Sequence, residues 1–160
     1  MTADVARAPS AFAIAAAGLA DLDEAASLFD LYGVFYRRAS NPAAARAFLA
    51  ERLARRDSAI FLARDAVGQA VGFMQLYPSL SSAGLRRIWI LNDLYVALAA
   101  RRRGLGGLLL DHARDFAKAD GALRLELSTE RTNSGAQALY RAAGWVQDEV
   151  FVKFTLPLKT

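Results

Sequence analysis

The stretch that most constrains this chain runs from Ile88 to Gly107 and reads IWILNDLYVALAARRRGLGG. Its apolar start predicts a strand buried on both faces, and the glycines that follow predict a turn into a helix. A helix N-terminus has unpaired N–H groups and partial positive charge, so it suits a phosphate or pyrophosphate. The three arginines from Arg101 to Arg103 add guanidinium groups that bind phosphate oxygens in pairs. The segment therefore predicts a phosphate-binding turn in an α/β protein.

The spacing of the glycines matches neither of two common phosphate loops. No Lys-Ser or Lys-Thr follows Gly104, Gly106 and Gly107, which excludes a P-loop. The pattern G-x-G-G also differs from the dinucleotide fingerprint G-x-G-x-x-G. Taken alone, the stretch is also compatible with an ordinary strand-to-helix turn that carries solvated arginines.

A second motif lies about thirty residues further along the chain, with the spacing N-x-x-A-x-x-L-Y-x-x-x-G-W between Asn133 and Trp145. Together with the strand LNDLYV and the R-x-x-G-x-G loop, it resembles the GNAT superfamily of acyl-CoA-dependent N-acetyltransferases. Within that superfamily, the chain is similar to the branch related to yeast histone and polyamine acetyltransferases. Two motifs in the right order are far more specific than either alone.

The resemblance implies an α/β (α+β) fold, a bent, mixed and mostly antiparallel sheet of about six to seven strands with about four helices on both faces. The expected order is βααβββαβαββ. Periodicity and turn residues place the expected helices at 21–37, 41–56, 106–120 and 133–143. They place the strands at 12–14, 58–64, 68–76, 86–96, 123–129, 145–147 and 150–156, with a loop at 77–85.

The resemblance also implies where the acetyl donor, acetyl-CoA, binds. The arginine-glycine loop would hold the pyrophosphate of coenzyme A, and backbone amides after a bulge in the central strand would pair with the pantetheine arm. An asparagine matching Asn133 lies near the cofactor in related enzymes, and the tyrosine matching Tyr140 faces the thioester sulfur. The expected cofactor-binding residues are Leu94, Tyr95, Val96, Arg101, Arg102, Arg103, Gly104, Leu105, Gly106, Gly107, Asn133 and Tyr140.

Acetyl transfer to an amine needs one group to remove a proton and another to protonate the departing thiolate. A phenol with a pKa of about 10 stays protonated at neutral pH, so Tyr140 is the expected acid. Asn92 replaces the glutamate base of some relatives, which leaves Asp93 as the nearest carboxylate. Strand alternation places Asp93 opposite Asn92, where it could instead be a structural ion-pair partner. Glu130 and an ordered water relay are alternative bases.

The acceptor amine is expected between the first two helices and the loop before the central strand. Aromatic rings near a carboxylate such as Asp30 suit a cationic amine. The expected substrate-binding residues are Tyr32, Tyr36, Tyr77, Trp89 and Asn92, with Phe35 near them. The same rings could equally be core and dimer contacts. His112 lies among apolar neighbours, which favours packing over catalysis.

Composition limits the function further. The 160 residues suggest one domain over 11–160 after a flexible lead-in over 1–10. There is no cysteine and one histidine, which excludes a disulfide, a thiolate site and a multi-histidine metal centre within one chain. No apolar run approaches the roughly 20 residues that span a bilayer, so a cytoplasmic protein without membrane contact is expected.

The sequence leaves three functions open. The first is an acetyl-CoA-dependent N-acetyltransferase acting on a small-molecule, peptide or protein amine. The second is a non-catalytic acyl-CoA-binding module, in which the absent glutamate marks lost chemistry. The third is a nucleic-acid-binding domain, disfavoured because the basic residues behind the net charge of +4 are dispersed, apart from the arginine run. A homodimer is also expected, since the apolar tail from Val150 to Leu158 is compatible with one.

Overall fold

The computed structural model describes residues 11–158, so the expected lead-in over 1–10 lies outside the described residues. Contacts divide the chain into two compact units, Met1–Ser128 and Thr129–Thr160, and each is described by itself. The single domain expected over 11–160 stays a prediction.

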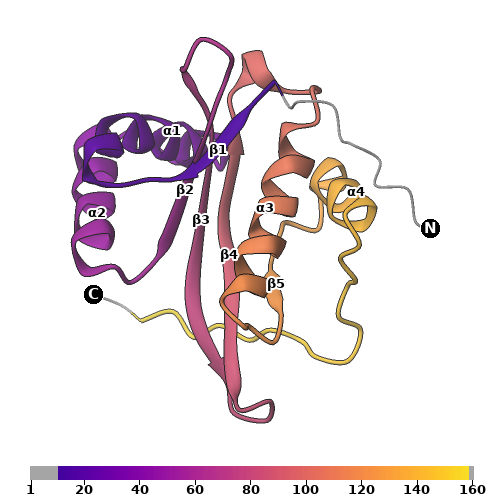
Figure 1. Cartoon of the computed structure of the whole chain (residues 1–160). Helices are drawn as coiled ribbons and strands as arrows, with labels where there is room; N and C mark the ends of the chain where they lie inside the picture. The colour runs from indigo at the N-terminus through magenta and orange to yellow at the C-terminus, as the bar shows by residue number, and fades with distance from the viewer. Residues whose placement is uncertain (1–10, 159–160) are drawn as a thin grey trace. The chain divides into compact units, whose positions relative to one another are not determined.

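The first unit contains one sheet and three α-helices (Figure 1). Along the chain its elements are β1 (Ala13–Ala16), η1 (Leu19–Asp21), α1 (Leu22–Phe35), α2 (Pro42–Arg55), β2 (Ala59–Arg64), β3 (Ala70–Ser81), β4 (Arg86–Val96), η2 (Leu98–Ala100), α3 (Leu105–Ala119) and β5 (Leu125–Leu127). The strands lie in the order β1-β2-β3-β4-β5, antiparallel except for the parallel pair β4–β5. The mixed, mostly antiparallel α/β sheet expected from the sequence is confirmed.

Helices cover both faces of this sheet, because neighbouring strand residues point to opposite sides. On one face Phe73 of β3 meets Phe29 of α1, with ring centroids 5.6 Å apart. On the other face Gly72 faces α3 so closely that an added Cβ would lie 3.2 Å from Leu105 Cδ2. Figure 1 shows α1 and α2 side by side, and the rings of Phe29 and Phe48 stack between them. The cluster on the α1–α2 side forms the core beneath the site described below.

Two helices, α2 and α4, begin at asparagines whose side chains cap them. Asn41 caps α2 by accepting the Ala44 N–H at 3.0 Å, and Pro42 takes the first helical position. In the second unit Asn133 caps α4 (Ser134–Ala142) by accepting the Ala136 N–H at 3.1 Å. The helices expected to begin at residues 41 and 133 are confirmed to within one residue, with these asparagines as their caps.

The loop expected at 77–85 is wrong over its first half, because β3 continues to Ser81 and forms a long hairpin with β4. Proline and serine usually break strands, but Pro78 pairs with Trp89 here. The pairing with β2 ends at Leu76, so Pro78 lies where β3 has become an edge strand. An edge position tolerates the missing N–H of proline.

The two C-terminal strands expected at 145–147 and 150–156 are absent, and no strand lies between residues 145 and 158. The sheet of the described chain therefore has five strands rather than six to seven. An alternating apolar pattern gives a segment one suitable face, but a strand also needs a partner for its N–H and C=O groups. No such partner pairs with this segment within residues 11–158.

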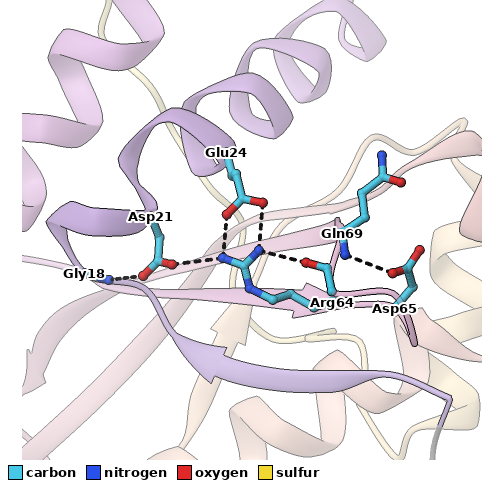
Figure 2. Close-up of polar contacts among 7 residues, drawn as sticks. Gly18, Asp21, Glu24, Arg64, Asp65 and Gln69 are labelled. Carbon is cyan, nitrogen blue, oxygen red and sulfur yellow. Dashed lines mark hydrogen bonds and ion pairs between the residues drawn. The ribbon is translucent and has the colours of Figure 1, made fainter.

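An ion-pair cluster fixes the start of α1 to the end of β2 (Figure 2). The Arg64 guanidinium donates to both Glu24 oxygens at 2.7 and 2.6 Å and to Asp21 Oδ1 at 2.9 Å. The other Asp21 oxygen accepts the Gly18 N–H at 2.9 Å. The hydrogen bonds from Arg64 lower the pKa of Glu24, although this partly exposed group gains less than a buried one would.

Replacing Arg64 with glutamine should lower the free energy of unfolding by about 1 kcal/mol at pH 7, since Glu24 loses a bidentate partner and Asp21 loses a single charged hydrogen bond. A lowered pKa stabilises the fold above the unfolded value of 4.5 and ceases to do so as the pH falls through the folded value. The difference between wild type and variant should therefore shrink below about pH 4.5. Urea unfolding at pH 7 and pH 3.5 measures this.

The control is Arg124→Gln, which removes a single exposed pair to Glu126 at 2.7 Å. Its cost should stay below about 0.5 kcal/mol. Equal losses in the two variants, or a difference for Arg64→Gln that does not change with pH, would contradict the assigned role of the cluster.

Candidate active site

The pairing of β3 with β4 shifts register in the middle of the sheet. Gln75 pairs with Asp93 and Leu76 pairs with Leu91, which leaves Asn92 without a partner on β3. This extra residue is a β-bulge, a device that redirects side chains and interrupts the ladder. The bulge implied by the resemblance is present. Strand alternation suggested that Asn92 and Asp93 face opposite sides, but the bulge lets both line one cavity.

That cavity has a volume of about 350 Å³ and lies where α1, α2 and the segment joining them meet β3 and β4. It combines aromatic walls with three charged side chains and two side-chain amides. Its lining residues are Phe29, Asp30, Gly33, Arg38, Ala39, Asn41, Ala44, Ala45, Phe48, Tyr77, Asn92 and Asp93. A concave site with apolar walls and a few polar groups is typical of small-molecule binding.

Asp93 is the most buried charged residue of the cavity, with 4% of its surface exposed. Burial raises the pKa of its carboxyl, and hydrogen bonds from Gln75 and Asn92 oppose that rise. The Gln75 amide donates to Oδ2 at 2.8 Å and the Asn92 amide donates to Oδ1 at 3.1 Å. A carboxylate with a raised pKa is a stronger proton acceptor than an ordinary one.

Gln75 is a positioning residue that sequence reasoning missed. It is fully buried, and its Oε1 accepts the Ser58 hydroxyl at 2.9 Å while its amide holds Asp93. This chain of hydrogen bonds fixes the orientation of the carboxylate. The available signal was a single polar residue inside the apolar run VGFMQL.

Of the expected acceptor-binding residues, Tyr77 and Asn92 line the cavity. Burial, with a smaller contribution from the charge of Asp93, raises the pKa of Tyr77 to about 12, so its phenol stays protonated. Tyr32 donates to the Asn92 carbonyl at 3.2 Å, and Tyr36 meets the Tyr32 ring edge-on at 5.0 Å. These two tyrosines lie beside the bulge but are not among the residues that line the cavity.

Trp89 lies on the other face of the sheet. Its ring packs against Phe116 of α3 with centroids 5.0 Å apart, and its Nε1 donates to Asp120 at 2.9 Å. It does not line the cavity. Trp89 is therefore buried because it packs against α3.

The arginine-glycine loop joins η2 to α3 and has an unusual backbone. Arg102 and Gly104 both have positive φ, at 58° and 79°, and Gly104 caps α3. A Cβ added at Gly104 or Gly107 would meet nothing within 4 Å, so space lies open beside this helix N-terminus. Leu105 is buried and anchors the first turn of α3. Turn conformations with left-handed residues can direct successive N–H groups toward an anion.

The three arginines of the loop have different surroundings. Arg101 is held by the protein, since its Nε donates to the Val96 carbonyl at 2.9 Å. Its guanidinium also lies 5.5 Å from the ring centroid of Phe35. Arg103 lies over Phe12 at 4.9 Å, and Arg102 is exposed. Arg101 therefore binds the loop to the end of β4, whereas the side chain of Arg102 is exposed to solvent.

The last residues of β4, which precede this loop in the sequence, are unpaired in the described chain on the edge that faces β5. The pairing with β5 ends at Leu91, whereas the pairing with β3 continues to Val96. Within residues 11–158 no strand pairs with that edge over Leu94, Tyr95 and Val96. An unpaired strand edge presents N–H and C=O groups that can bind an extended ligand.

In the second unit Tyr140 lies on α4, one residue after Leu139, with its ring 6.3 Å from that of Trp145. Asn133 caps the same helix, and the Glu130 carbonyl accepts the Gln137 amide at 3.3 Å. These contacts hold together the segment that carries the second motif.

Other residues contribute packing rather than chemistry. His112 meets Phe61 edge-on at 4.7 Å, and burial lowers the pKa of its imidazole. In the described part of the chain, no cluster of three or more potential metal ligands occurs. No helix among the described residues is long and apolar enough to cross a membrane.

The comparisons with known proteins agree on one family. The profile of the Acetyltransferase (GNAT) family matches residues 25–145. The uncharacterized N-acetyltransferase YhfO of Bacillus subtilis (strain 168) is 46% identical over 82% of this chain and 87% of its own length. The aminoglycoside N(6')-acetyltransferase type 1 of Klebsiella aerogenes is 30% identical over 69% of this chain and 74% of its own length. A crystal structure of a probable acetyltransferase matches with a TM-score of 0.88 and 43% identity, over 92% of this chain and 99% of that chain.

Proposed function

The chain belongs to the acetyltransferase (GNAT) family, and on that premise we propose that it transfers the acetyl group of acetyl-CoA to a small amine bound in the α1–α2 cavity. Acetyl transfer to an amine is the activity that the family and its named relatives share. The observation that carries the proposal is the buried carboxylate of Asp93, which lines this cavity at the bulge of the central strand.

The acetyl donor would be held by the arginine-glycine loop and by the open edge of β4. The unobstructed space beside Gly104 and Gly107 and the positive φ at Arg102 suit a pyrophosphate at the N-terminus of α3. The backbone groups of Leu94, Tyr95 and Val96 would pair with the extended pantetheine arm. When bound, acetyl-CoA supplies a thioester carbonyl that is reactive toward amines.

Asp93 would act as the general base. An alkyl ammonium has a pKa of about 10 and must lose a proton before it can attack a carbonyl. A buried carboxylate with a raised pKa accepts that proton more readily than a solvated one. Gln75 keeps the carboxylate in place, and Tyr77 and the other aromatic walls would exclude water from the amine.

Tyr140 would donate the proton that the departing thiolate needs. Replacing it with phenylalanine should lower turnover about a hundredfold, because a positioned acid is worth at least this much. The affinity for acetyl-CoA should remain nearly unchanged, since only one hydroxyl is lost. Steady-state rates with calorimetric titration of acetyl-CoA check both expectations. An unchanged rate would remove Tyr140 from the mechanism.

The proposed function is tested by incubating the purified chain with acetyl-CoA and a panel of small amines, and by measuring thiol release together with the mass of the acetylated product. Saturable cofactor binding without transfer to any amine would favour the non-catalytic acyl-CoA-binding alternative. If the chain binds a polyanion, if that binding weakens steeply as the salt concentration rises, and if acetyl-CoA does not compete with it, the nucleic-acid-binding alternative would be favoured. The homodimer, the absence of nucleic-acid and membrane partners, and the resemblance to the yeast branch stay predictions.

A further inference from the structure

The charges in the cavity are not those of a site for a polyamine. Asp30 already accepts the Ser40 hydroxyl at 2.6 Å and the Asn41 N–H at 2.7 Å, so it is explained by holding the segment between α1 and α2. Both Asp93 oxygens also accept hydrogen bonds, from Gln75 and Asn92, but neither bond ties Asp93 to the segment between α1 and α2. Asp93 is also the more buried of the two carboxylates and lies at the bulge, so we assign the ammonium group to it. The third charged lining residue is the cation Arg38, which would repel a second ammonium.

Arg38 is placed at the cavity by the way α1 ends. The Arg37 N–H donates to the Val34 carbonyl at 2.9 Å and the Arg38 N–H donates to the Gly33 carbonyl at 3.0 Å, with Arg37 at a φ of 62°. These two bonds form a Schellman cap, which turns the chain back over the helix that it closes. The terminal residues of α1 therefore direct Arg38 toward the cavity rather than away from it.

The guanidinium of Arg38 lies over the buried residue Gly33. A Cβ added at Gly33 would lie 3.5 Å from both Nε and Nη2 of Arg38, an ordinary contact distance, so the guanidinium packs directly beside this residue of the cavity wall. Arg38 forms no ion pair within residues 11–158. It is near enough to the Asp93 carboxyl to lower its pKa slightly, but it is not bonded to that group. The cavity thus presents a cation that is not ion-paired, among the described residues, near its buried base.

The size and walls of the cavity narrow the ligand further. Its volume of about 350 Å³ is near the lower limit of small-molecule sites, which run from roughly 300 to 1,000 Å³. Phe29, Phe48 and Tyr77 provide apolar and aromatic surface beside the charges. A single small molecule with one amine, one anionic group and an apolar part matches these features.

We propose that the acceptor is a small amine that also carries a carboxylate, as an amino acid with an apolar side chain does. The carboxylate binds the guanidinium of Arg38, while the amine lies at Asp93. Arg38 is thus the specificity residue of the site. This inference rests on the proposed binding of the acceptor in the α1–α2 cavity, and it excludes polycationic amines as preferred acceptors.

The experiment compares three acceptors that share one apolar part, namely phenylalanine, phenylalanine amide and phenethylamine. Acetylation by wild type should favour phenylalanine in kcat/KM by about tenfold or more, because a charge-assisted pair is lost with the other two acceptors. Arg38→Gln should remove this preference by lowering kcat/KM for the amino acid alone. Arg38→Lys should restore part of it, and Arg55→Gln, on an exposed arginine paired with Glu51, should match wild type.

A second measurement separates this inference from the proposed activity. Phenylalanine and phenethylamine are titrated calorimetrically into each variant saturated with coenzyme A, where no transfer can occur. Binding of phenylalanine that is lost in Arg38→Gln supports the inference even if no turnover is seen, in which case the proposed activity fails. Equal acetylation of all three acceptors overturns the inference and leaves the activity intact. If phenylalanine is neither bound nor acetylated, the inference is overturned, whatever the result with the other acceptors.

Discussion

Replacing Gly104 with glutamate is expected to lower the affinity for acetyl-CoA at least about a hundredfold while the chain remains folded. Gly104 has a φ of 79° at the N-cap of α3, where a side chain would project into the open space proposed for the pyrophosphate. A carboxylate there would repel the phosphates and compete with them for the helix N-terminus. Calorimetric titration with acetyl-CoA measures the loss.

The chain provides a matched control at the other end of the same helix. Gly121 has a φ of 71° and also has nothing within 4 Å of an added Cβ. Gly121→Glu therefore introduces the same left-handed strain and the same charge, at a cost in stability of about 1 kcal/mol, away from the proposed site. Gly104→Lys keeps the strain and reverses the charge. Equal binding losses in the two glutamate variants would show that strain, not charge, is responsible, and unchanged binding in Gly104→Glu would remove the loop from cofactor binding.

The helix boundaries and the order of elements from β1 to α4, though not the two absent C-terminal strands, could be predicted from the sequence because their causes are local. Asn41 before Pro42 is a cap followed by a suitable first residue, and Asn133 is a cap of the same kind. The length of β3 could not be predicted in this way. The strand tolerates Pro78 only because the pairing of β3 with β2 ends at Leu76. Strand pairing decides this, and the strand propensity of the individual residues does not show it.

The chemistry of the site depends on the register in which β3 pairs with β4, and a local sequence pattern does not predict this register. A strict alternation along β4 separates Asn92 from Asp93, and only the shift opposite Gln75 brings both side chains to the cavity. The same limitation affected Trp89, whose aromatic ring suited an acceptor pocket but whose strand position directs it to α3. Residue types could therefore be proposed from sequence, but the face on which each lies could not.

Arg38 illustrates a different limit. Arg38 is one of the seventeen arginines of the chain, and no sequence pattern distinguishes it. It became a candidate only through the Schellman cap of α1 and its place beside Gly33 in the cavity wall. Asp93, by contrast, was predictable as a candidate base, because it is the carboxylate next to the position where relatives have a glutamate. Its burial and its contact with Gln75 were not predictable. A proton acceptor needs both the right residue type and a surrounding that raises its pKa.

Replacing Asp93 with asparagine is expected to lower kcat by a factor of about 10² to 10⁴, the range for loss of a positioned general base. Asparagine keeps the size of the side chain but cannot accept the ammonium proton, and its NH2 group replaces one of the two oxygens that accept from Gln75 and Asn92. The pH profile gives a second readout. Below its pKa the Asp93 carboxyl is protonated and inactive, so wild-type activity should fall as the pH decreases through a value above the ordinary 3.8. The variant should lack this fall.

Asp30→Asn is the matched control, because it neutralises the other carboxylate of the same cavity. Since both Asp30 oxygens accept hydrogen bonds within the protein, this variant should alter KM or stability but retain the acidic fall in the pH profile. Circular dichroism and thermal unfolding of both variants separate loss of chemistry from loss of fold. If Asp93→Asn retains both the rate and the pH dependence of wild type, the proton goes elsewhere, and Glu130 or an ordered water relay becomes the base to test.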